Sequence, residues 1–167
     1  MSMLNVEHFG GFFDIYSNKW GVFRSTCDDV SYHFNAGVYI LLGEIDSGAW
    51  AFTSALCSKK KNNACILDNE TKFYFNETEV TLDDIRKISC DLDGPFNYTG
   101  SFNKSVEKRV EDSITKYKLP YTVKDIQKMF HLTDERYKRA LKYAGNERFR
   151  CNAALGFVQR KKIFCFP

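Results

Sequence analysis

The chain has 167 residues, a usual length for one globular domain with a sizeable core. Hydrophobic residues make up 44% and charged residues 27%, both ordinary for a globular protein, while the aromatic share of 16% is high and favours a packed core or an aromatic binding surface. The formal net charge is only +3, so it does not indicate a dedicated nucleic-acid-binding protein, and no apolar run approaches the roughly 18 residues of a membrane-spanning helix.

The first third of the chain predicts strands. Residues 9–23 are aromatic and interrupted by glycines, a pattern typical of short strands and turns. Val30, Tyr32 and Phe34 alternate with polar residues, which predicts a strand. After a turn, residues 38–42 form a continuous apolar run, and we expect a strand there that is buried on both faces of a parallel sheet.

The middle of the chain mixes helix and strand signals. Residues 49–57 contain good helix formers and are expected to form a helix. Residues 64–82 read as short strands joined by turns, and Thr81 with Asp84 matches a small capping box that begins a helical turn. Residues 86–96 then predict a strand that breaks at a glycine–proline turn.

The second half is predicted to be helical. Apolar residues within positions 106–117 recur about every four residues, which predicts an amphipathic helix. A second capping box, Thr122 with Asp125, begins the next helix. Residues 133–162 contain two helical stretches broken at residues 144–146, and a short apolar strand closes the chain.

The cysteine and histidine pattern predicts neither a metal site nor secretion. The six cysteines contain no C-x-x-C pair and the three histidines are far apart, so we expect no metal and no cofactor. The N-terminal residues lack the basic segment and apolar stretch of a signal peptide. We therefore expect a cytoplasmic protein with reduced cysteines and no membrane association.

Residues 43–50 have the glycine spacing of a phosphate-binding loop without its chemistry. A working loop reads G-x-x-x-x-G-K-[ST], in which the lysine contacts the outer phosphates and the hydroxyl binds Mg²⁺. Here alanine and tryptophan stand at these two positions, and an aspartate adds negative charge where phosphates would lie. We expect a degenerate loop retained for its fold, which comprises Gly43, Asp46, Ser47, Gly48, Ala49 and Trp50.

The order of these parts resembles the nucleotide-binding domain of ABC ATPases. The strand that leads into residues 43–50 is similar to the family's run into its phosphate-binding loop, and residues 62–96 resemble the segment that ends at the Q-loop. Glu147, Arg148 and Arg150 stand at the E-R-x-R spacing of the signature motif, before an alanine-rich stretch and an apolar strand. The signature-like positions are Tyr143, Ala144, Gly145, Asn146, Glu147, Arg148 and Arg150.

This resemblance implies an α/β fold, namely a truncated ABC-ATPase-like P-loop core with an N-terminal β-rich part and a helical subdomain. We expect a single degenerate domain over residues 1–167. Within it, the resemblance implies a β-rich core at residues 1–100, a helical part at residues 101–145, and a signature-like helix with the last strand at residues 146–167.

Several groups that the family uses for hydrolysis are missing. Asp93 stands at the expected Q-loop glutamine, and residues 144–146 lack the signature serine. Pro167 stands where the family's metal-binding aspartate follows the last strand. The resemblance therefore implies a pseudo-enzyme with no catalytic residues.

The resulting expectation is a non-catalytic protein that acts by protein–protein binding. A small phage or mobile-element inhibitor of a host machine, for example an anti-defence or anti-CRISPR protein, is one concrete form, and homodimerisation is compatible with it. Two alternatives stay open: a lysine-less nucleotide-binding regulatory subunit or decoy of an active ABC ATPase, and a nucleic-acid-binding module that uses the basic C-terminal third. Aromatic residues and arginine dominate binding hot spots, so the interaction candidates beside the signature-like positions are Phe12, Phe13, Trp20, Arg139 and Lys142.

Overall fold

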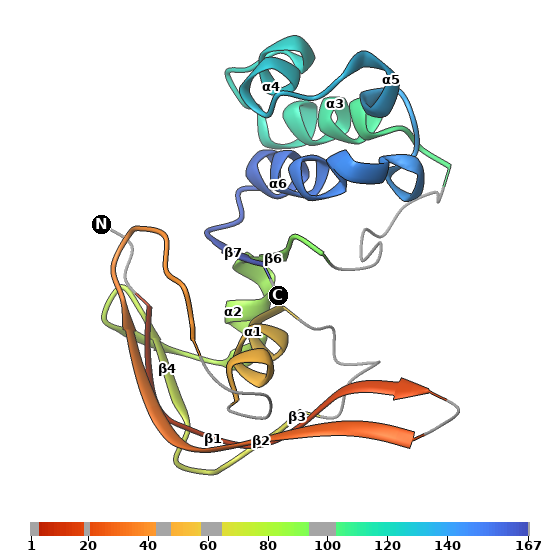
Figure 1. Cartoon of the computed structure of the whole chain (residues 1–167). Helices are drawn as coiled ribbons and strands as arrows, with labels where there is room; N and C mark the ends of the chain where they lie inside the picture. Colours follow the sequence, from red (N-terminus) through yellow and green to blue (C-terminus); the bar gives the residue numbers. More distant parts are fainter. Residues whose placement is uncertain (1–3, 19–20, 43–47, 58–64, 94–102, 167) are drawn as a thin grey trace. The chain divides into compact units, whose positions relative to one another are not determined.

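A computed structural model describes the chain except for residues 1–3, 19–20, 43–47, 58–64, 94–102 and 167 (Figure 1). The described part is a mixed α/β protein with one antiparallel sheet, one parallel strand pair and several helices. It divides into two compact units, Met1–Lys87 and Ile88–Phe166, called here the N-terminal and C-terminal units. The division falls earlier in the chain than the expected end of the β-rich part at residue 100.

The N-terminal unit is built on an antiparallel sheet in the order β2-β1-β4-β5, and β3 pairs with a further part of β1. β1 and β2 are long neighbouring strands, whereas the sequence predicted short strands and turns in this region. Irregularities in their register, rather than turns, accommodate the glycine-rich part of β1. The strands are β1 (Leu4–Asn18), β2 (Gly21–Phe34), β3 (Cys65–Leu67), β4 (Lys72–Phe75) and β5 (Thr78–Val80).

Two helices complete this unit, α1 (Ala49–Cys57) and α2 (Leu82–Ile88). The predicted helix at residues 49–57 is thus confirmed. Phe52 of α1 packs edge-on against Phe9 of β1, with ring centroids 5.1 Å apart. The guanidinium of Arg86 donates a hydrogen bond of 2.9 Å to the Ala55 carbonyl, which ties α2 to α1.

The predicted capping box at the start of α2 is confirmed. The Asp84 backbone N–H donates to the Thr81 hydroxyl at 3.2 Å, and the Thr81 backbone N–H donates to the Asp84 carboxylate at 3.3 Å. These bonds satisfy two of the N–H groups that a helix start leaves without partners.

The prediction of a buried parallel strand at residues 38–42 is wrong. No strand forms there, and Val38, Ile40 and Leu42 are 98%, 80% and 90% exposed. β2 ends at Phe34, and the next residue forms a local contact in which the Asn35 backbone N–H donates to the Tyr39 hydroxyl at 2.9 Å. The Tyr39 ring then packs edge-on against Phe34, and this local turn takes the place of strand pairing.

The C-terminal unit combines helices with one pair of parallel strands, β6 with β7. The predicted helix at residues 106–117 and the predicted last strand are confirmed. The elements are β6 (Ser89–Asp91), α3 (Val106–Tyr117), α4 (Val123–Met129), α5 (Asp134–Tyr137), the 3-10 turns η1 (Leu141–Tyr143) and η2 (Gly145–Glu147), α6 (Arg148–Val158) and β7 (Ile163–Cys165).

The sequence explains where these helices begin. The Ser105 hydroxyl accepts the Lys108 backbone N–H at 3.1 Å and caps α3. Thr122 and Asp125 form the predicted capping box of α4. One apolar face of each helix turns inward, and the buried core of the unit comprises Val106, Val110, Ile126, Leu132, Tyr137, Leu141, Ala144, Cys151, Ala154, Leu155 and Val158.

Candidate functional site

The signature-like residues 143–150 lie on η1, η2 and the first turn of α6. Tyr143 is 57% exposed, and the Lys142 ammonium lies 4.8 Å from the centre of its ring. The Arg136 guanidinium donates a hydrogen bond of 3.1 Å to the Tyr143 carbonyl. The structure therefore brings two cations and an exposed aromatic ring together on the surface of the C-terminal unit.

Gly145 allows this arrangement because of its backbone conformation. Its φ is +59°, in the left-handed region that favours glycine, and an added Cβ would lie 3.3 Å from the Arg136 guanidinium carbon. The next residues, Asn146 and the buried Glu147, complete η2. Ala144 is fully buried in the core.

Arg136 is a member of this surface that the sequence did not predict, because its contact with Tyr143 depends on the turn between α5 and η1. The predicted candidate Lys142 also donates to the Asn103 side chain at 3.3 Å. The predicted candidate Arg139 forms an ion pair of 2.7 Å with Glu135, one helical turn earlier.

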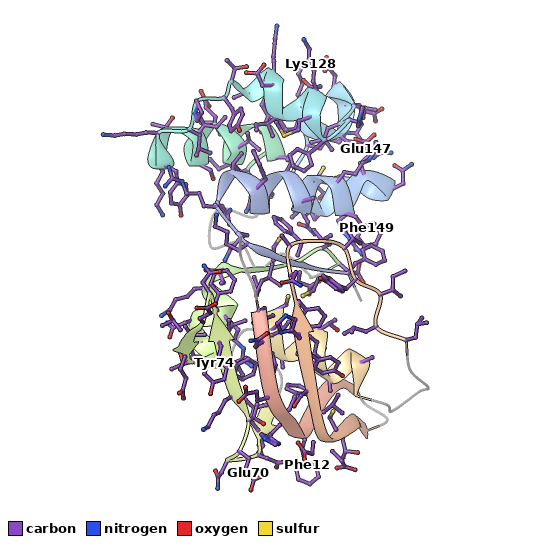
Figure 2. All side chains as sticks on the ribbon, turned by 90° about the vertical axis from the view of Figure 1, so that its left-hand side faces the viewer. Phe12, Glu70, Tyr74, Lys128, Glu147 and Phe149 are labelled. Carbon is purple, nitrogen blue, oxygen red and sulfur yellow. The ribbon has the colours of Figure 1, made fainter. Side chains whose placement is uncertain are left out.

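Glu147 is buried and joins neighbouring segments rather than lying on the surface. Its carboxylate accepts the Thr133 backbone N–H at 2.9 Å, and the same carboxylate lies 3.5 Å from the Arg150 guanidinium. Arg150 in turn donates to the His131 carbonyl at 2.7 Å. Glu147 (Figure 2) and Arg150 thus hold the loop between α4 and α5 against the start of α6.

Replacement of Glu147 by alanine is expected to lower the free energy of unfolding of the C-terminal unit by about 1–3 kcal/mol, because the partly buried Thr133 N–H loses its acceptor and Arg150 loses its carboxylate partner. Glu147→Gln keeps an amide oxygen that can accept the N–H and should cost less. Urea unfolding followed by circular dichroism at 222 nm measures both variants. Equal stability of the alanine variant and the unchanged protein would contradict this role.

Arg148 and Asp93 form an ion pair that joins the signature-like segment to the end of the β6 region. Asp93 stands at the position that the resemblance assigns to the Q-loop glutamine. Its backbone N–H also donates to the Asp91 carboxylate at 2.9 Å. The Arg148 guanidinium carbon lies 5.4 Å from the centre of the Phe149 ring.

Most of the degenerate phosphate-binding loop lies outside the described residues, including Gly43, Asp46 and Ser47. Gly48 is buried with a φ of +86°, and an added Cβ would lie 2.7 Å from the Cys27 sulfur. Ala49 and Trp50 begin α1, and the Trp50 side chain is outside the described part.

The N-terminal interaction candidates are only partly described. Phe12 lies in β1 and is half exposed (Figure 2). Phe13 also lies in β1, but its side chain is outside the described part, as is the whole of Trp20. The exposed apolar side chains at residues 38–42 are surface residues that the sequence analysis assigned to the core.

Burial suppresses the reactivity of two cysteine thiols, Cys151 and Cys27. It raises the pKa of Cys151 to about 12, with the Glu147 carboxylate as a second cause, and it also raises the pKa of Cys27. Since the thiolate is the nucleophile, neither residue is an activated thiol.

At pH 8 about one Cys151 thiol in 10,000 should be ionised, so we expect no alkylation by iodoacetamide in the native protein. Cys57 is only partly buried and should be alkylated first among the described cysteines. Peptide mass spectrometry after labelling measures each site, and labelling in urea serves as the positive control. Equal labelling of Cys151 and Cys57 without urea would contradict the burial.

The described residues contain no group of three or more histidine, cysteine, aspartate or glutamate side chains placed to hold a metal ion. Within the same ranges, no helix combines the length and apolarity needed to cross a bilayer. A scan of the chain against protein-family models finds no matching family, and a search of curated proteins finds no matching sequence. The resemblance to ABC ATPases therefore rests on the residues of this chain.

Proposed function

We propose that the chain is a non-catalytic protein, derived from an ABC-type nucleotide-binding domain, that acts by binding another protein. The observation that carries this proposal is the exposed apolar run at residues 38–42 of the N-terminal unit. Val38, Ile40 and Leu42 alternate with the less exposed Tyr39 and Leu41, so the most exposed apolar side chains recur at every second position.

Such an arrangement is costly to leave in water. Full burial of one aliphatic side chain is worth about 1.5–3 kcal/mol relative to full exposure. Single exposed apolar residues are normal on proteins, whereas a contiguous exposed cluster is typical of an interaction site. A partner that covers residues 38–42 would recover this free energy.

The surface around Tyr143 gives independent support. It combines an exposed tyrosine with Arg136 and Lys142, and tyrosine and arginine are enriched in binding hot spots. This second surface belongs to the C-terminal unit and could contact the same partner or another one.

One strand pairing and the residues at two motif positions support the proposed ABC origin and loss of catalysis, whereas the strand expected before the phosphate-binding loop does not form. β6 pairs in parallel with β7 across a helical segment, as expected for the strands that the resemblance assigns to the Q-loop and to the end of the signature helix. Ala49 has no ammonium group to contact phosphates, and Asp93 is paired with Arg148. An inhibitor of a host machine, encoded by a phage or mobile element, is the concrete form that we propose for such a protein.

The test combines a turnover assay with a matched pair of variants. We expect no MgATP hydrolysis by the purified chain above the buffer rate. Ile40→Glu should abolish capture of the partner from a host lysate, whereas Ile66→Glu, which changes another exposed isoleucine of the same unit, should not. Equal capture by all three proteins, or nucleotide turnover by the purified chain, would overturn the proposal.

A further inference from the structure

The C-terminal ends of α3 and α6 lie side by side (Figure 1), and four exposed cationic residues stand at or just beyond these ends. Arg160 follows α6 and donates a hydrogen bond of 2.9 Å to the Tyr117 carbonyl at the end of α3. The Arg160 guanidinium carbon and the Lys116 ammonium lie 5.8 Å and 5.1 Å from the centre of the Tyr117 ring. We call these two cations and their exposed near neighbours in sequence the α3–α6 basic cluster, which comprises Lys116, Lys118, Arg160 and Lys162.

This cluster belongs to a unit with a strong positive charge. Residues 88–166 contain 16 lysines and arginines against nine aspartates and glutamates, a net of +7. Residues 1–87 contain eight against twelve, a net of −4. The small net charge of the whole chain is therefore the sum of a strongly positive C-terminal unit and a negative N-terminal unit.

The cluster also has no compensating carboxylate nearby in the sequence. Among the described residues, none of its four side chains forms an ion pair, and residues 113–121 and 148–166, which supply it, contain no acidic residue. Six other cations of the unit have a carboxylate within 4.0 Å, namely Lys104, Lys108, Lys138, Arg139, Arg148 and Arg150.

Helix architecture explains only part of the cluster. Cations near a helix C-terminus are favourable because the carbonyl end of the helix carries partial negative charge. That accounts for Lys116 and for Arg160, which satisfies a carbonyl at the end of α3. Lys118 is the C-cap residue of α3 and fits the same explanation, but the exposed Lys162 lies four residues beyond the end of α6 and does not.

We propose that the α3–α6 basic cluster binds the phosphodiester backbone of nucleic acid without reading its sequence. Phosphate contacts of this kind need flexible, exposed cations and no apolar anchor. A protein partner would be expected to use an exposed aromatic or aliphatic anchor instead. Tyr117, the aromatic residue within the cluster, is only partly exposed and has Lys116 and Arg160 against its ring.

This activity is separate from the proposed protein binding, which centres on residues 38–42 of the other unit. The two can therefore fail independently, and each has its own variants. Release of condensed counterions favours binding to nucleic acid, so the affinity of such a site should fall as salt rises. The affinity of an apolar interface should not show this dependence.

The experiment is a fluorescence anisotropy titration of the full chain into a labelled 20-base-pair DNA duplex. With about four phosphate contacts, affinity should fall about 100-fold between 50 and 200 mM salt, because each contact contributes about −0.9 to the slope of log K against log salt. Lys116→Gln combined with Lys118→Gln should reduce that slope from about −4 to about −2.

The matched control is Lys124→Gln combined with Lys128→Gln on α4. It removes the same charge from exposed lysines of the same unit (Lys128 is labelled in Figure 2). Unlike the cluster lysines, however, Lys124 interacts electrostatically with Asp134, and Lys128 with Asp125. It should leave the slope near that of the unchanged protein. Absence of DNA binding at 50 mM salt, or equal loss in both double variants, would overturn the proposal. So would a polyglutamate peptide that binds as tightly as the duplex, because the cluster would then be a site for acidic protein.

Discussion

Replacement of Gly11 by alanine is expected to destabilise the N-terminal unit by at least about 3 kcal/mol, a large part of the 5–15 kcal/mol that stabilises a typical domain. Gly11 lies in β1 and pairs with Cys27 of β2 on one side and with Leu67 of β3 on the other. Its φ is +134°, and an added Cβ would lie 2.0 Å from the Ile66 carbonyl oxygen.

The size of this effect follows from what the new methyl group meets. A flexible side chain could move aside, but the atoms around the Gly11 position belong to the backbone of β3, and Leu67 Cα is also only 3.0 Å away. Relief of the clash requires β3 to separate from β1 or the strained backbone of residue 11 to change. Backbone strain of this kind costs about 1–3 kcal/mol by itself.

Urea unfolding followed by tryptophan fluorescence measures this effect selectively, because both tryptophans, Trp20 and Trp50, lie in the N-terminal unit. Gly37→Ala is the matched control. An added Cβ at Gly37 would make only ordinary contact, 3.5 Å from the Tyr39 ring. An unfolding midpoint for Gly11→Ala equal to that of Gly37→Ala would show that β3 does not lie against β1 as described.

Local sequence signals predicted the elements that are stabilised by interactions between residues close together in the sequence. Val30, Tyr32 and Phe34 alternate in sequence and lie in β2, because period-two alternation directly reports which face of a strand is buried. The capping box of Thr122 and Asp125 is equally local, since its hydrogen bonds join residues three positions apart.

The wrong prediction at residues 38–42 has the opposite cause. An apolar run shows that a segment contains no polar side chains, but it does not identify the strand with which the segment should pair. Here the segment forms a local turn instead, in which the Asn35 backbone N–H donates to the Tyr39 hydroxyl four residues away. The same sequence feature therefore predicted a core strand and produced the most exposed apolar surface of the described chain.

The candidate surface could be predicted only in outline. The spacing of Glu147, Arg148 and Arg150 singled out this segment, but the partners of these residues are distant in sequence. Glu147 accepts from Thr133, and Arg148 pairs with Asp93, 55 residues away. No pattern within a single segment contains such pairs, because they are created by the packing of α6 against its neighbours.

The helical core of the C-terminal unit should depend most strongly on Tyr137. This residue is 1% exposed, and its hydroxyl donates a hydrogen bond of 3.1 Å to the Val123 carbonyl of α4. Burial raises the pKa of the Tyr137 phenol above its ordinary value, so the group stays protonated and keeps donating at any moderate pH.

We expect Tyr137→Ala to lower the free energy of unfolding of the C-terminal unit by about 3–5 kcal/mol, the usual cost of removing a buried aromatic side chain. Tyr137→Phe keeps the ring and should cost about 1 kcal/mol through the lost hydrogen bond. Tyr143→Ala removes an exposed ring from the same unit and should change stability by no more than about 0.5 kcal/mol. Urea unfolding followed at 222 nm, to which the helices of this unit contribute strongly, orders the three variants. Because a buried ring fills volume that water cannot replace, similar midpoints for Tyr137→Ala and Tyr143→Ala would mean that α5 does not pack into this core.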